Sequence, residues 1–386
     1  MTSAPPYPSM QAHPDLQSQP SNPSDPSAGL LPTPTPLQLI DPDGRLSADH
    51  GPLTLPEDSV LLALYRTMVL GRRFDQQATA LTKQGRLAVY PSARGQEAGE
   101  IAATLALREQ DWLFPTYRDS MAIVARGVDP VQVLTLLKGD WHCGYDPYEH
   151  HVAPQCTPLA TNTTHAVGLG HAARIKGEDT VALVLLGDGA TSEGDTHEAL
   201  NFAAVWNTPT VFFVQNNGYA ISVPLSKQTA APTLAHKGIG YGMRSVLVDG
   251  NDAAAVHRVV TDAVAAAATG DGPTLIEAVT YRIEAHTNAD DAGRYRDQAE
   301  VQSWLARDPI DRLRTYLSER GVLDQDAAAA IDAEAEEQAA QLRRRMNADA
   351  DLDPVMLFEH VLAEPTPVLL AQRAMLLAEL ADGDES

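Results

Sequence analysis

One acidic residue stands between two glycines at the end of an apolar run, in the segment LVLLGDGATSEGD. This residue is Asp188, and bare backbone on both sides would let a bulky ligand approach closely. Asn217 follows a second apolar run downstream. One carboxylate, one side-chain amide oxygen and a nearby main-chain carbonyl form a hard oxygen shell that suits Mg²⁺, with diphosphate oxygens and water completing it. The pair predicts a magnesium-dependent diphosphate site, although Gly-Asp-Gly alone is more typical of a tight turn.

The elements that must position this pair are short apolar runs separated by helical segments. Continuous apolar strands alternating with helices indicate a parallel sheet that is covered on both faces. Asp188 and Asn217 would then emerge at the same sheet edge, where open α/β sheets bind ligands. Ser192–Asp195 has the pattern of a capping box, which predicts a helix N-terminus whose dipole favours an anion. The predicted strands are VALVLL (181–186), TVFFVQ (210–215), SVLVDG (245–250) and TLIEAVT (274–280).

The composition of the 386-residue chain restricts its partners and its location. With 28 basic and 51 acidic residues the net charge is −23, which argues against nucleic acids and membrane surfaces as partners because both are anionic. No apolar run reaches the roughly 18 to 20 residues that a membrane helix requires. Cys143 and Cys156 are too few for a secreted disulfide framework, and we find no signal peptide. We therefore expect a cytoplasmic protein.

Three regions of different composition are expected along the chain. Residues 1–48 are rich in Pro and Ser and cannot bury a core, so they are predicted to be a disordered arm. Residues 55–320 are predicted to form the α/β domain, which begins with an amphipathic helix. Residues 321–386 are predicted to be a helical C-terminal extension of the same domain.

The segment GDGATSEGDTHEALNFAAVWNTPTVFFVQNNGYAISVP resembles the alpha subunit of the heterotetrameric 2-oxo acid dehydrogenases. The resemblance extends from about Leu55 to Leu317 and includes YPSARGQEA, TYRD, PLAT, YRIEAHTNADD and RYR. It implies a thiamine diphosphate-binding α/β fold, with a parallel central sheet, helices on both faces and a helical C-terminal region. It also implies that Asp188 and Asn217 bind Mg²⁺ through their side chains and Tyr219 through its main-chain oxygen.

The same resemblance implies a set of cofactor contacts. Arg118 would bind the diphosphate, which a guanidinium fork matches, and the alternative is a surface salt bridge with Asp119. Leu159 would act through its backbone beside the aminopyrimidine ring, although a leucine fits a plain core position equally well. The resemblance also suggests a potassium ion under the 156–162 loop, where Cys156 replaces one of the usual oxygen ligands and leaves the site in doubt. The implied contacts are Tyr117, Arg118, Thr157, Leu159, Gly187, Asp188, Gly189, Ala190, Asn217, Tyr219, Ile221 and His286.

His286 is the predicted catalytic residue, on a polar segment after the last predicted strand. The resemblance implies that it contacts the cofactor and assists transfer to the lipoyl group, and an imidazole that titrates near neutrality suits proton transfer. A loop histidine without function is the alternative. Arg282, with Arg294 and Arg296, would supply positive charge around the cofactor. Gln215 stands where some members of the family have a phosphate-binding arginine.

Two other patterns are set aside. The group HCGYDPYEHH (142–151) and Cys156 contain zinc-binding residue types, but structural zinc sites normally repeat paired ligands at short spacing and a second pair is lacking. VGLGHAA matches the dinucleotide fingerprint at Gly168 and Gly170, but that fingerprint requires a preceding strand, and here a polar segment precedes it. These glycines are expected inside a helix that is already under way.

The resemblance implies a reaction that this chain performs only with a partner. That reaction is the thiamine diphosphate- and Mg²⁺-dependent oxidative decarboxylation of a branched-chain 2-oxo acid, followed by reductive acylation of the lipoyl group of a dihydrolipoyl acyltransferase. PLATN, GYGMRSVLVDGND and YRIEAHTNADD are closer to the branched-chain members than to the pyruvate ones. A beta subunit would provide the glutamate at the aminopyrimidine ring, in a complex of two alpha and two beta chains. The alternatives are a pyruvate dehydrogenase (acetyl-transferring) alpha subunit and a non-catalytic assembly subunit of the same fold.

Overall fold

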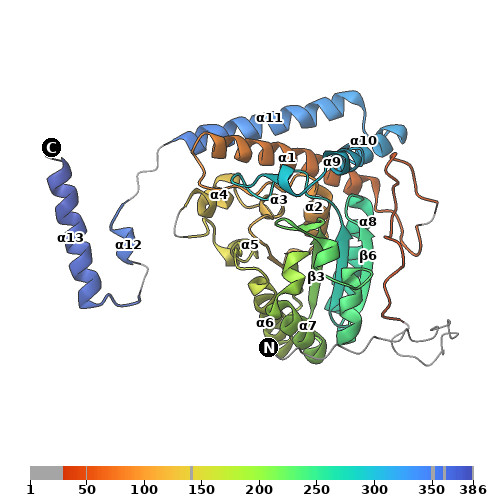
Figure 1. Cartoon of the computed structure of the whole chain (residues 1–386), viewed down its shortest axis with the longest axis horizontal. Coiled ribbons are helices and arrows are strands. Elements are labelled where there is room, and N and C mark those ends of the chain that lie inside the picture. Colours follow the sequence, from red (N-terminus) through yellow and green to blue (C-terminus); the bar gives the residue numbers. More distant parts are fainter. Residues whose placement is uncertain (1–28, 49, 140–141, 349–352, 360–361, 385–386) are drawn as a thin grey trace, which may run out of the picture. The chain divides into compact units, whose positions relative to one another are not determined.

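The computed structural model describes residues 29–48, 50–139, 142–348, 353–359 and 362–384. The chain divides into two compact units, Met1–Arg343 and Arg344–Ser386. The first unit contains a central sheet and the helices that cover it (Figure 1). Among the described residues, no helix is long and apolar enough to cross a membrane.

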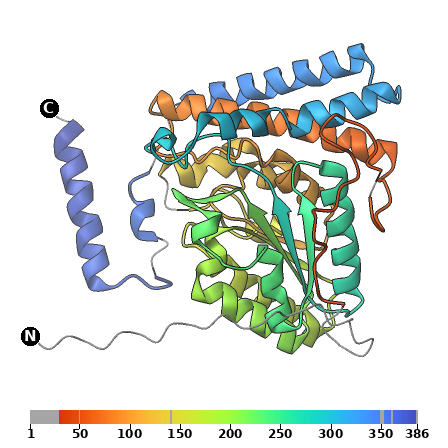
Figure 2. The same cartoon turned by 45° about the vertical axis from the view of Figure 1, so that its right-hand side comes forward.

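The core of the first unit is a five-stranded parallel sheet with the strand order β1-β2-β3-β7-β6, which Figure 2 shows from the side. β2 and β3 are paired in register, with Leu183 opposite Val211 and Gly187 opposite Gln215. Nearly every residue of these two strands is buried, as expected of a sheet covered on both faces. The strands are β1 (Trp112–Phe114), β2 (Ala182–Gly187), β3 (Thr210–Asn216), β4 (Tyr219–Ala220), β5 (Val223–Pro224), β6 (Arg244–Asp249) and β7 (Thr274–Val279). The four predicted strands are confirmed as β2, β3, β6 and β7, each within one residue of its expected start.

Helices cover both faces of the sheet, as predicted. On one face, Val184 and Phe212 join an apolar cluster with Ala166 of α6 and with residues of α7. On the other face, Gly99 of α2 approaches the ring of Phe213, because neighbouring residues of a strand point to opposite sides. The α-helices are α1 (Asp58–Lys83), α2 (Glu97–Leu105), α3 (Ser120–Ala125), α4 (Pro130–Lys138), α5 (Pro147–His150), α6 (Thr161–Lys176), α7 (Gly194–Trp206), α8 (Ala253–Ala268), α9 (Gln298–Leu305), α10 (Pro309–Glu319), α11 (Gln325–Asn347), α12 (Met356–Glu359) and α13 (Pro367–Asp384). The 3₁₀ helices are η1 (Gly189–Ser192), η2 (Leu225–Lys227), η3 (Leu234–Tyr241) and η4 (Ala292–Arg294).

Two long helices, α1 and α11, lie side by side at one side of the first unit (Figures 1 and 2). The side of α1 that carries Leu64 is buried, as the amphipathic spacing of its sequence predicts. Two arginine–glutamate pairs join the helices on their exposed sides: Arg66 binds Glu334, and Arg73 Nε donates to Glu336 at 2.6 Å. Exposed pairs of this kind add little stability, so the buried side of α1 carries most of its attachment.

The last part of the predicted disordered arm, 1–48, is packed against the first unit. A backbone bridge joins it to β6, and Leu39 and Ile40 are buried. The backbone N–H groups of both residues donate to the Asp252 carboxylate, at 2.6 and 2.7 Å. Disorder through the end of the arm is therefore a wrong prediction, because a short extension of the sheet edge and two apolar side chains suffice to fix a segment of poor composition. The part of the arm before residue 29 lies outside the described residues.

The predicted extension, 321–386, is divided between the two units. α11 belongs to the first unit as far as Arg343, and it buries Ile331 there. α12 and α13 belong to the second unit, where Val368 and Met375 of α13 are 68% and 61% exposed. The expectation of a single domain through the whole extension is therefore wrong, because the chain divides into two units within α11, after Arg343.

Candidate active site

A cavity lies at the carboxyl ends of the parallel strands, the sheet edge at which open α/β folds bind ligands. Its lining comes from the segments that follow β1, β2, β3 and β7, together with the residue before α2 and the loop before α6. All the predicted cofactor contacts line this cavity except Thr157, which lies exposed on its loop. The predicted residues that the fold brings together are Tyr117, Arg118, Leu159, Gly187, Asp188, Gly189, Ala190, Asn217, Tyr219, Ile221 and His286.

Asp188 is a buried carboxylate of this cavity. Its side chain is 1% exposed, and its Oδ2 accepts a hydrogen bond from Gln228 Nε2 at 2.6 Å. Burial raises the pKa of the carboxyl group, and the Gln228 bond and the charge of Arg282 offset this only in part. A divalent cation at the carboxylate would offset the remaining cost of burying its charge.

Glycine is needed on the two sides of Asp188 for different physical reasons. A β-carbon on Gly189 would lie 2.7 Å from the β-carbon of Ala220, so the turn after β3 could not pack there. A β-carbon on Gly187 would meet no protein atom within 4 Å. Gly187 therefore leaves room for a ligand, as predicted, whereas Gly189 is required by the packing of the chain against itself.

The helix predicted after Asp188 is present. One 3₁₀ turn, η1, comes first, and α7 begins at Gly194, within the segment Ser192–Asp195 where the sequence predicts a helix N-terminus. Within the part of the chain that the structure describes, no side chain caps α7, so the capping box predicted for Ser192–Asp195 is wrong. Thr196 instead donates its hydroxyl to the carbonyl of Ala190 at 2.7 Å. This bond ties the first turn of α7 to the backbone that carries Asp188.

The other two predicted metal ligands offer oxygen atoms of the kind that Mg²⁺ prefers. Asn217 is 5% exposed; its Nδ2 donates to Gln96, while its Oδ1 receives only a long bond from Tyr219 N at 3.3 Å among those formed by the described residues. The carbonyl of Tyr219 accepts from Arg282 at 3.2 Å and keeps a second lone pair. Among the described residues, no group of three or more His, Cys, Asp or Glu side chains is placed to hold a metal ion. The donor set around Asp188 therefore fits Mg²⁺, which shares its shell with phosphate and water, better than Zn²⁺.

Arg282 holds a strained turn at the cavity wall. Its guanidinium is almost fully buried and donates to the carbonyls of Tyr219 and Ile221, at 3.2 and 2.6 Å, and to the hydroxyl of Tyr295 at 2.9 Å. Ile221 has a φ of 55°, which is costly for a β-branched residue, and its side chain is 55% exposed. The sequence predicted positive charge at Arg282, whereas the structure shows in addition that this residue shapes the turn.

Arg118 joins three segments of the cavity wall. Its Nη1 donates to the carbonyl of Ser92 at 2.8 Å, and its Nη2 contacts the carbonyl and Nδ1 of His286 at 3.1 and 3.0 Å. The alternative surface salt bridge with Asp119 is wrong, because Arg118 is buried and Asp119 accepts from Thr116 and from a glutamine instead. Since a guanidinium can only donate, Nδ1 of His286 accepts and the neutral ring carries its hydrogen on Nε2.

The environment of His286 changes the expected titration. Burial, followed by the charges of Arg118 and Arg282, lowers the pKa of the imidazole to about 4. The expectation that this ring titrates near neutrality is therefore wrong for the protein without an anion in the cavity. A neutral His286 acts as a hydrogen-bond donor at pH 7, and an anion bound beside it would raise its pKa again.

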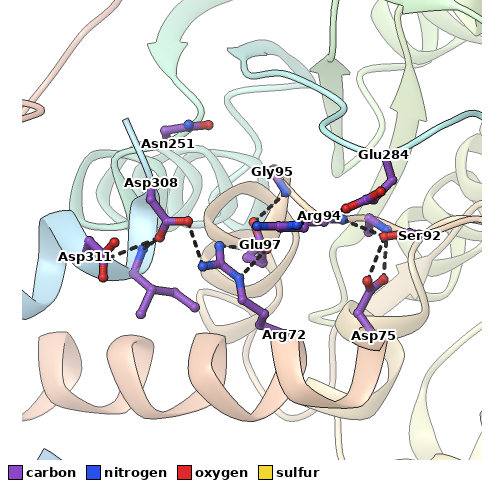
Figure 3. Close-up of polar contacts among 12 residues, drawn as sticks. Arg72, Asp75, Ser92, Arg94, Gly95, Glu97, Asn251, Glu284, Asp308 and Asp311 are labelled. Atoms are coloured by element: carbon purple, nitrogen blue, oxygen red, sulfur yellow. Dashed lines mark hydrogen bonds and ion pairs between the residues drawn. The ribbon is translucent and has the colours of Figure 1, made fainter. Parts of the chain in front are cut away.

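The segment 90–97, which contains Ser92, is fixed by hydrogen bonds to α1. Figure 3 shows Asp75 of α1 under Ser92, whose hydroxyl donates to it at 2.7 Å. Tyr90 and the Ala93 N–H also donate to Asp75, both at 2.9 Å. Burial raises the pKa of Asp75 to about 6, and the three hydrogen bonds oppose that rise.

A second buried carboxylate fixes the other end of the same segment. Glu97 accepts from the backbone N–H of Gly95 and pairs with Arg72, both at 2.8 Å, and Arg72 also binds Asp308 at 2.7 Å (Figure 3). Gly95 has a φ of 97°, and a β-carbon there would lie 2.1 Å from the carbonyl of Tyr281. The segment 90–97 is thus clamped between α1 and the chain that follows β7.

Residues 65–353 match the sequence profile of the family described as "Dehydrogenase E1 component". The chain belongs to this family. It is 49% identical over 350 residues to the 3-methyl-2-oxobutanoate dehydrogenase subunit alpha of Mycobacterium tuberculosis, which covers 90% of this chain and 95% of that one. It is also 37% identical over 293 residues to the pyruvate dehydrogenase E1 component subunit alpha of Staphylococcus aureus (75% of this chain, 78% of that one). The pyruvate dehydrogenase E1 component subunit alpha of Acholeplasma laidlawii is 34% identical over 334 residues (86% and 96%).

The E1 family match and the five-stranded parallel sheet confirm the predicted thiamine diphosphate-binding α/β fold. The match also confirms the resemblance to the alpha subunits of 2-oxo acid dehydrogenases. Gly168 and Gly170 lie inside α6, as expected, and a β-carbon on Gly170 would lie 3.0 Å from Thr210, so close packing explains that glycine.

The suggested potassium ion under the 156–162 loop gains no support from this E1 chain. Asn162 turns its amide nitrogen, not its oxygen, toward the carbonyls of Leu185 and Phe114, at 2.8 and 3.3 Å. The thiol of Cys156 donates to the carbonyl of Pro158 at 3.1 Å. The carbonyls of Phe114, Leu185 and Pro158 thus each accept a hydrogen bond from a side chain of this loop.

Sequence reasoning missed the residues that support the ligands. Gln96 and Gln228 each bind one predicted metal ligand, and Asp75 acts through Ser92 and Arg118. Gln96 stands inside the family-like segment YPSARGQEA, and its proximity to a quoted motif was the available signal. Nothing in the sequence near Asp75 or Gln228 indicates their contacts, because both depend on how distant segments meet.

Proposed function

We propose that this chain is the alpha subunit of a branched-chain 2-oxo acid dehydrogenase. With a beta subunit it would catalyse the oxidative decarboxylation of 3-methyl-2-oxobutanoate and related 2-oxo acids, and transfer the acyl group to the lipoyl group of a dihydrolipoyl acyltransferase. The observation that carries the substrate class is the 49% identity, over almost the whole length of both chains, to a 3-methyl-2-oxobutanoate dehydrogenase alpha subunit. The pyruvate dehydrogenase relatives are 37% and 34% identical.

The cofactors of the proposal are thiamine diphosphate and Mg²⁺. Asp188, Asn217 Oδ1 and the carbonyl of Tyr219 would hold the metal, and their oxygen chemistry supports this assignment. When bound, thiamine diphosphate supplies the electron sink that allows the carboxylate of the 2-oxo acid to leave as carbon dioxide. The chain itself binds and orients the diphosphate and keeps the metal at the buried carboxylate.

Arg118 and His286 are proposed to bind the anionic part of the cofactor. Arg118 uses one N–H of Nη1 on Ser92 and both N–H groups of Nη2 on His286, and a guanidinium has five, so two donors remain for a phosphate oxygen. His286 is neutral at pH 7 and offers an N–H at Nε2, which suits hydrogen bonding to cofactor or acyl oxygens more than proton release. We propose His286 as the catalytic residue in this donating role.

A beta subunit is proposed to complete the site. Leu159, Ile221 and Val223 at and beside the cavity are 41%, 55% and 43% exposed, so apolar surface remains to be covered there. Three carboxylates line the cavity: Asp119 and Asp188 are buried and engaged by Thr116, Gln215 and Gln228, and Glu193 is exposed in the turn before α7. We infer that the glutamate required at the aminopyrimidine ring comes from the beta chain.

A pyruvate-specific enzyme remains the nearest alternative, because one or two methylenes in a pocket change discrimination by only about 1–3 kcal/mol. A non-catalytic assembly subunit is disfavoured by the joint presence of Asp188, Asn217, Arg118 and His286 at one cavity. No observation favours a further class of function.

The proposal is tested by producing the chain together with its beta subunit and measuring carbon dioxide release with thiamine diphosphate and Mg²⁺. 3-Methyl-2-oxobutanoate, 2-oxobutanoate and pyruvate are compared by kcat/KM. We expect the branched substrate to be preferred, and the Asp188→Asn complex, as the inactive control, to release none. Absence of release from all three substrates would refute the enzyme, and equal or better use of pyruvate would refute the branched-chain assignment alone.

A further inference from the structure

Three buried amide side chains and one carboxylate form a continuous chain of hydrogen bonds along the wall of the cavity. Asn217 Nδ2 donates to Gln96 Oε1 at 2.9 Å, and Gln96 Nε2 donates to Gln215 Oε1 at 2.9 Å. Gln215 Nε2 then donates to Asp119 Oδ1 at 2.6 Å. All four side chains are 5% exposed or less. We call this chain the amide relay.

Asp119 determines which end of each amide in the relay donates and which end accepts. Asp119 Oδ2 accepts from Thr116 N at 2.6 Å, and Oδ1 receives the amide nitrogen of Gln215, so both oxygens of the carboxyl group accept N–H donors. With Gln215 fixed in this way, its oxygen must face Gln96, and the oxygen of Gln96 must face Asn217. Reversing any one amide would set oxygen against oxygen or N–H against N–H in a buried place, where an unsatisfied group costs about 1–3 kcal/mol.

The last member of the relay is a predicted metal ligand. An asparagine binds a cation through its oxygen only, and its two ends are nearly equal in shape, so something must decide which end faces the metal. Gln96 takes the nitrogen end of Asn217, which leaves Oδ1 as the free end. Gln96, Gln215 and Asn217 all line the cavity, so the relay runs along the wall where the ion would lie.

The amino acid at position 215 is essential to this arrangement. Gln215 both accepts from Gln96 and donates to Asp119. The arginine that some members of the family carry at this position could donate to Asp119, but a guanidinium accepts no hydrogen bond, so Gln96 would lose the partner that fixes it. The orientation mechanism is therefore not available to chains that carry arginine here.

We propose that Gln96 and Gln215 are positioning residues, which hold the side-chain oxygen of Asn217 toward the bound magnesium ion. This inference rests on the proposed function, because it needs Asn217 to be a ligand. Outer-shell partners of metal ligands typically contribute about 10- to 100-fold in metal affinity. We expect a loss of this size when Gln96 is replaced, and a smaller loss when Gln215 is replaced, since Gln96 then keeps its bond to Asn217 but not its fixed orientation.

The test uses the full chain assembled with its beta subunit and Mn²⁺ as the probe of the magnesium site, with free Mn²⁺ followed by electron paramagnetic resonance in the presence of thiamine diphosphate. Gln96→Met and Gln215→Met replace each amide by an unbranched apolar side chain of similar length. Gln77→Met is the matched control, because Gln77 is a buried glutamine of α1 that does not line the cavity. We expect Gln96→Met to weaken Mn²⁺ binding most and Gln215→Met to weaken it less. Gln77→Met should bind Mn²⁺ as wild type does.

A second ligand background separates orientation from packing. Asn217→Asp gives a carboxylate, whose two ends are equivalent, so no relay is needed to choose the oxygen. Gln96→Met should therefore weaken Mn²⁺ binding about 10-fold or more in the Asn217 protein. It should cause no loss in the Asn217→Asp protein, where the oxygen of Gln96 faces a carboxylate oxygen and no longer supports the ligand. Equal losses in both backgrounds would overturn the inference and assign Gln96 a packing role.

The remaining outcomes separate this inference from the proposed function. If wild type shows no saturable Mn²⁺ binding with thiamine diphosphate, the proposed function itself fails, and the inference with it. If wild type binds Mn²⁺ and both methionine variants bind it equally well, only the amide relay is refuted. If thermal unfolding shows that Gln96→Met does not fold, Mn²⁺ binding by Gln215→Met is compared instead, in the Asn217 protein and in the Asn217→Asp protein.

Discussion

The two walls of the cavity are built by different means. The strand-end wall, Gly187–Ala190 with Gln215–Ile221, carries the proposed metal ligands and follows directly from β2 and β3. The loop wall, 90–97 with 282–286, carries Arg118's partners and is held by the buried carboxylates Asp75 and Glu97.

The two walls differ in which residues determine their structure. A strand end places a side chain by the regular geometry of the sheet, so the residue that touches the ligand is visible in a short motif. A loop has no such geometry, and it keeps its shape only through side chains that come from other elements. Asp75 and Arg72 on α1 fix the loop wall through the contacts that Figure 3 shows, and neither residue lines the cavity.

The largest effect is expected in the strand-end wall, at Asp188. Asp188→Asn removes the charge that attracts the metal, and we expect thiamine diphosphate affinity to fall more than about 100-fold, because even outer-shell losses cost about 10- to 100-fold. Calorimetric titration of the assembled alpha and beta chains with thiamine diphosphate measures this. Asp195→Asn, in the exposed first turn of α7, is the control and should bind as wild type. Full affinity in Asp188→Asn would remove this residue from the metal site.

In the loop wall, the largest effect is expected at Asp75. Asp75→Asn offers one acceptor oxygen where three donors now converge, so at least one buried donor loses its partner, at a cost of about 1–3 kcal/mol in the free energy of unfolding. Urea unfolding measures this cost. Asp58→Asn is the control, since Asp58 lies on the same helix as Asp75 and forms an exposed pair with Arg320 at the end of α10. If the two variants lost the same stability, Asp75 would have no special part in holding the loop wall.

Acid should change the stability of the loop wall through two groups, whose contributions to stability depend on pH in opposite directions. His286 has a folded pKa of about 4, below its unfolded value, so its stability contribution is complete above the unfolded pKa and is lost as the pH falls toward 4. Asp75 has a folded pKa of about 6, above its unfolded value, so its contribution is complete at low pH and is lost as the pH rises through 6.

These signs predict opposite changes in two variants. Between pH 4 and 6.5, His286→Asn loses a rise in stability with pH, so its slope of stability against pH should be lower than that of wild type. Asp75→Asn loses a fall in stability with pH, so its slope should be higher than that of wild type. Thermal unfolding at several pH values measures the slopes. Parallel slopes in all three proteins would contradict both assigned pKa directions.

The smallest effect is expected at the strained turn of the strand-end wall. Ile221→Gly relieves the positive φ and should raise the stability of the folded chain by about 1 kcal/mol, while it removes a side chain from the cavity and weakens cofactor binding. Val223→Gly, two residues on, is the control and should be destabilising by about 0.5–1 kcal/mol, because strand β5 gains nothing from glycine. A loss of stability in Ile221→Gly equal to that of Val223→Gly would show that the turn is not strained.

The sequence predicts the strand-end wall well for a physical reason. The apolar runs at β2 and β3 are long enough and buried enough to be recognised as parallel strands, and Asp188 and Asn217 stand directly where those strands end. The family resemblance then names the cofactor. The capping box was wrong because Ser192 ends the 3₁₀ turn η1, so Glu193 and not Ser192 is the residue that precedes α7.

Supporting contacts could not be predicted in the same way. The amide relay joins Asn217 to Gln96 and Asp119, which are more than 90 positions apart from it or from Gln215, so only the folded chain shows it. The hydrogen bonds from Leu39 and Ile40 of the arm to Asp252 could not be predicted either, because they also join distant parts of the sequence. His286 has a shifted pKa because two arginines and burial surround it, and composition carries no record of that environment.

The central claim is that a metal ion at Asp188 and Asn217 allows this acidic chain to bind a diphosphate. Calorimetric titration of thiamine diphosphate into the assembled alpha and beta chains, in Mg²⁺ and again in excess chelator, tests it most directly. We predict saturable binding in Mg²⁺ and a loss of more than about 100-fold in chelator, which exceeds what an outer-shell change produces. Equal affinity in both solutions would contradict the claim.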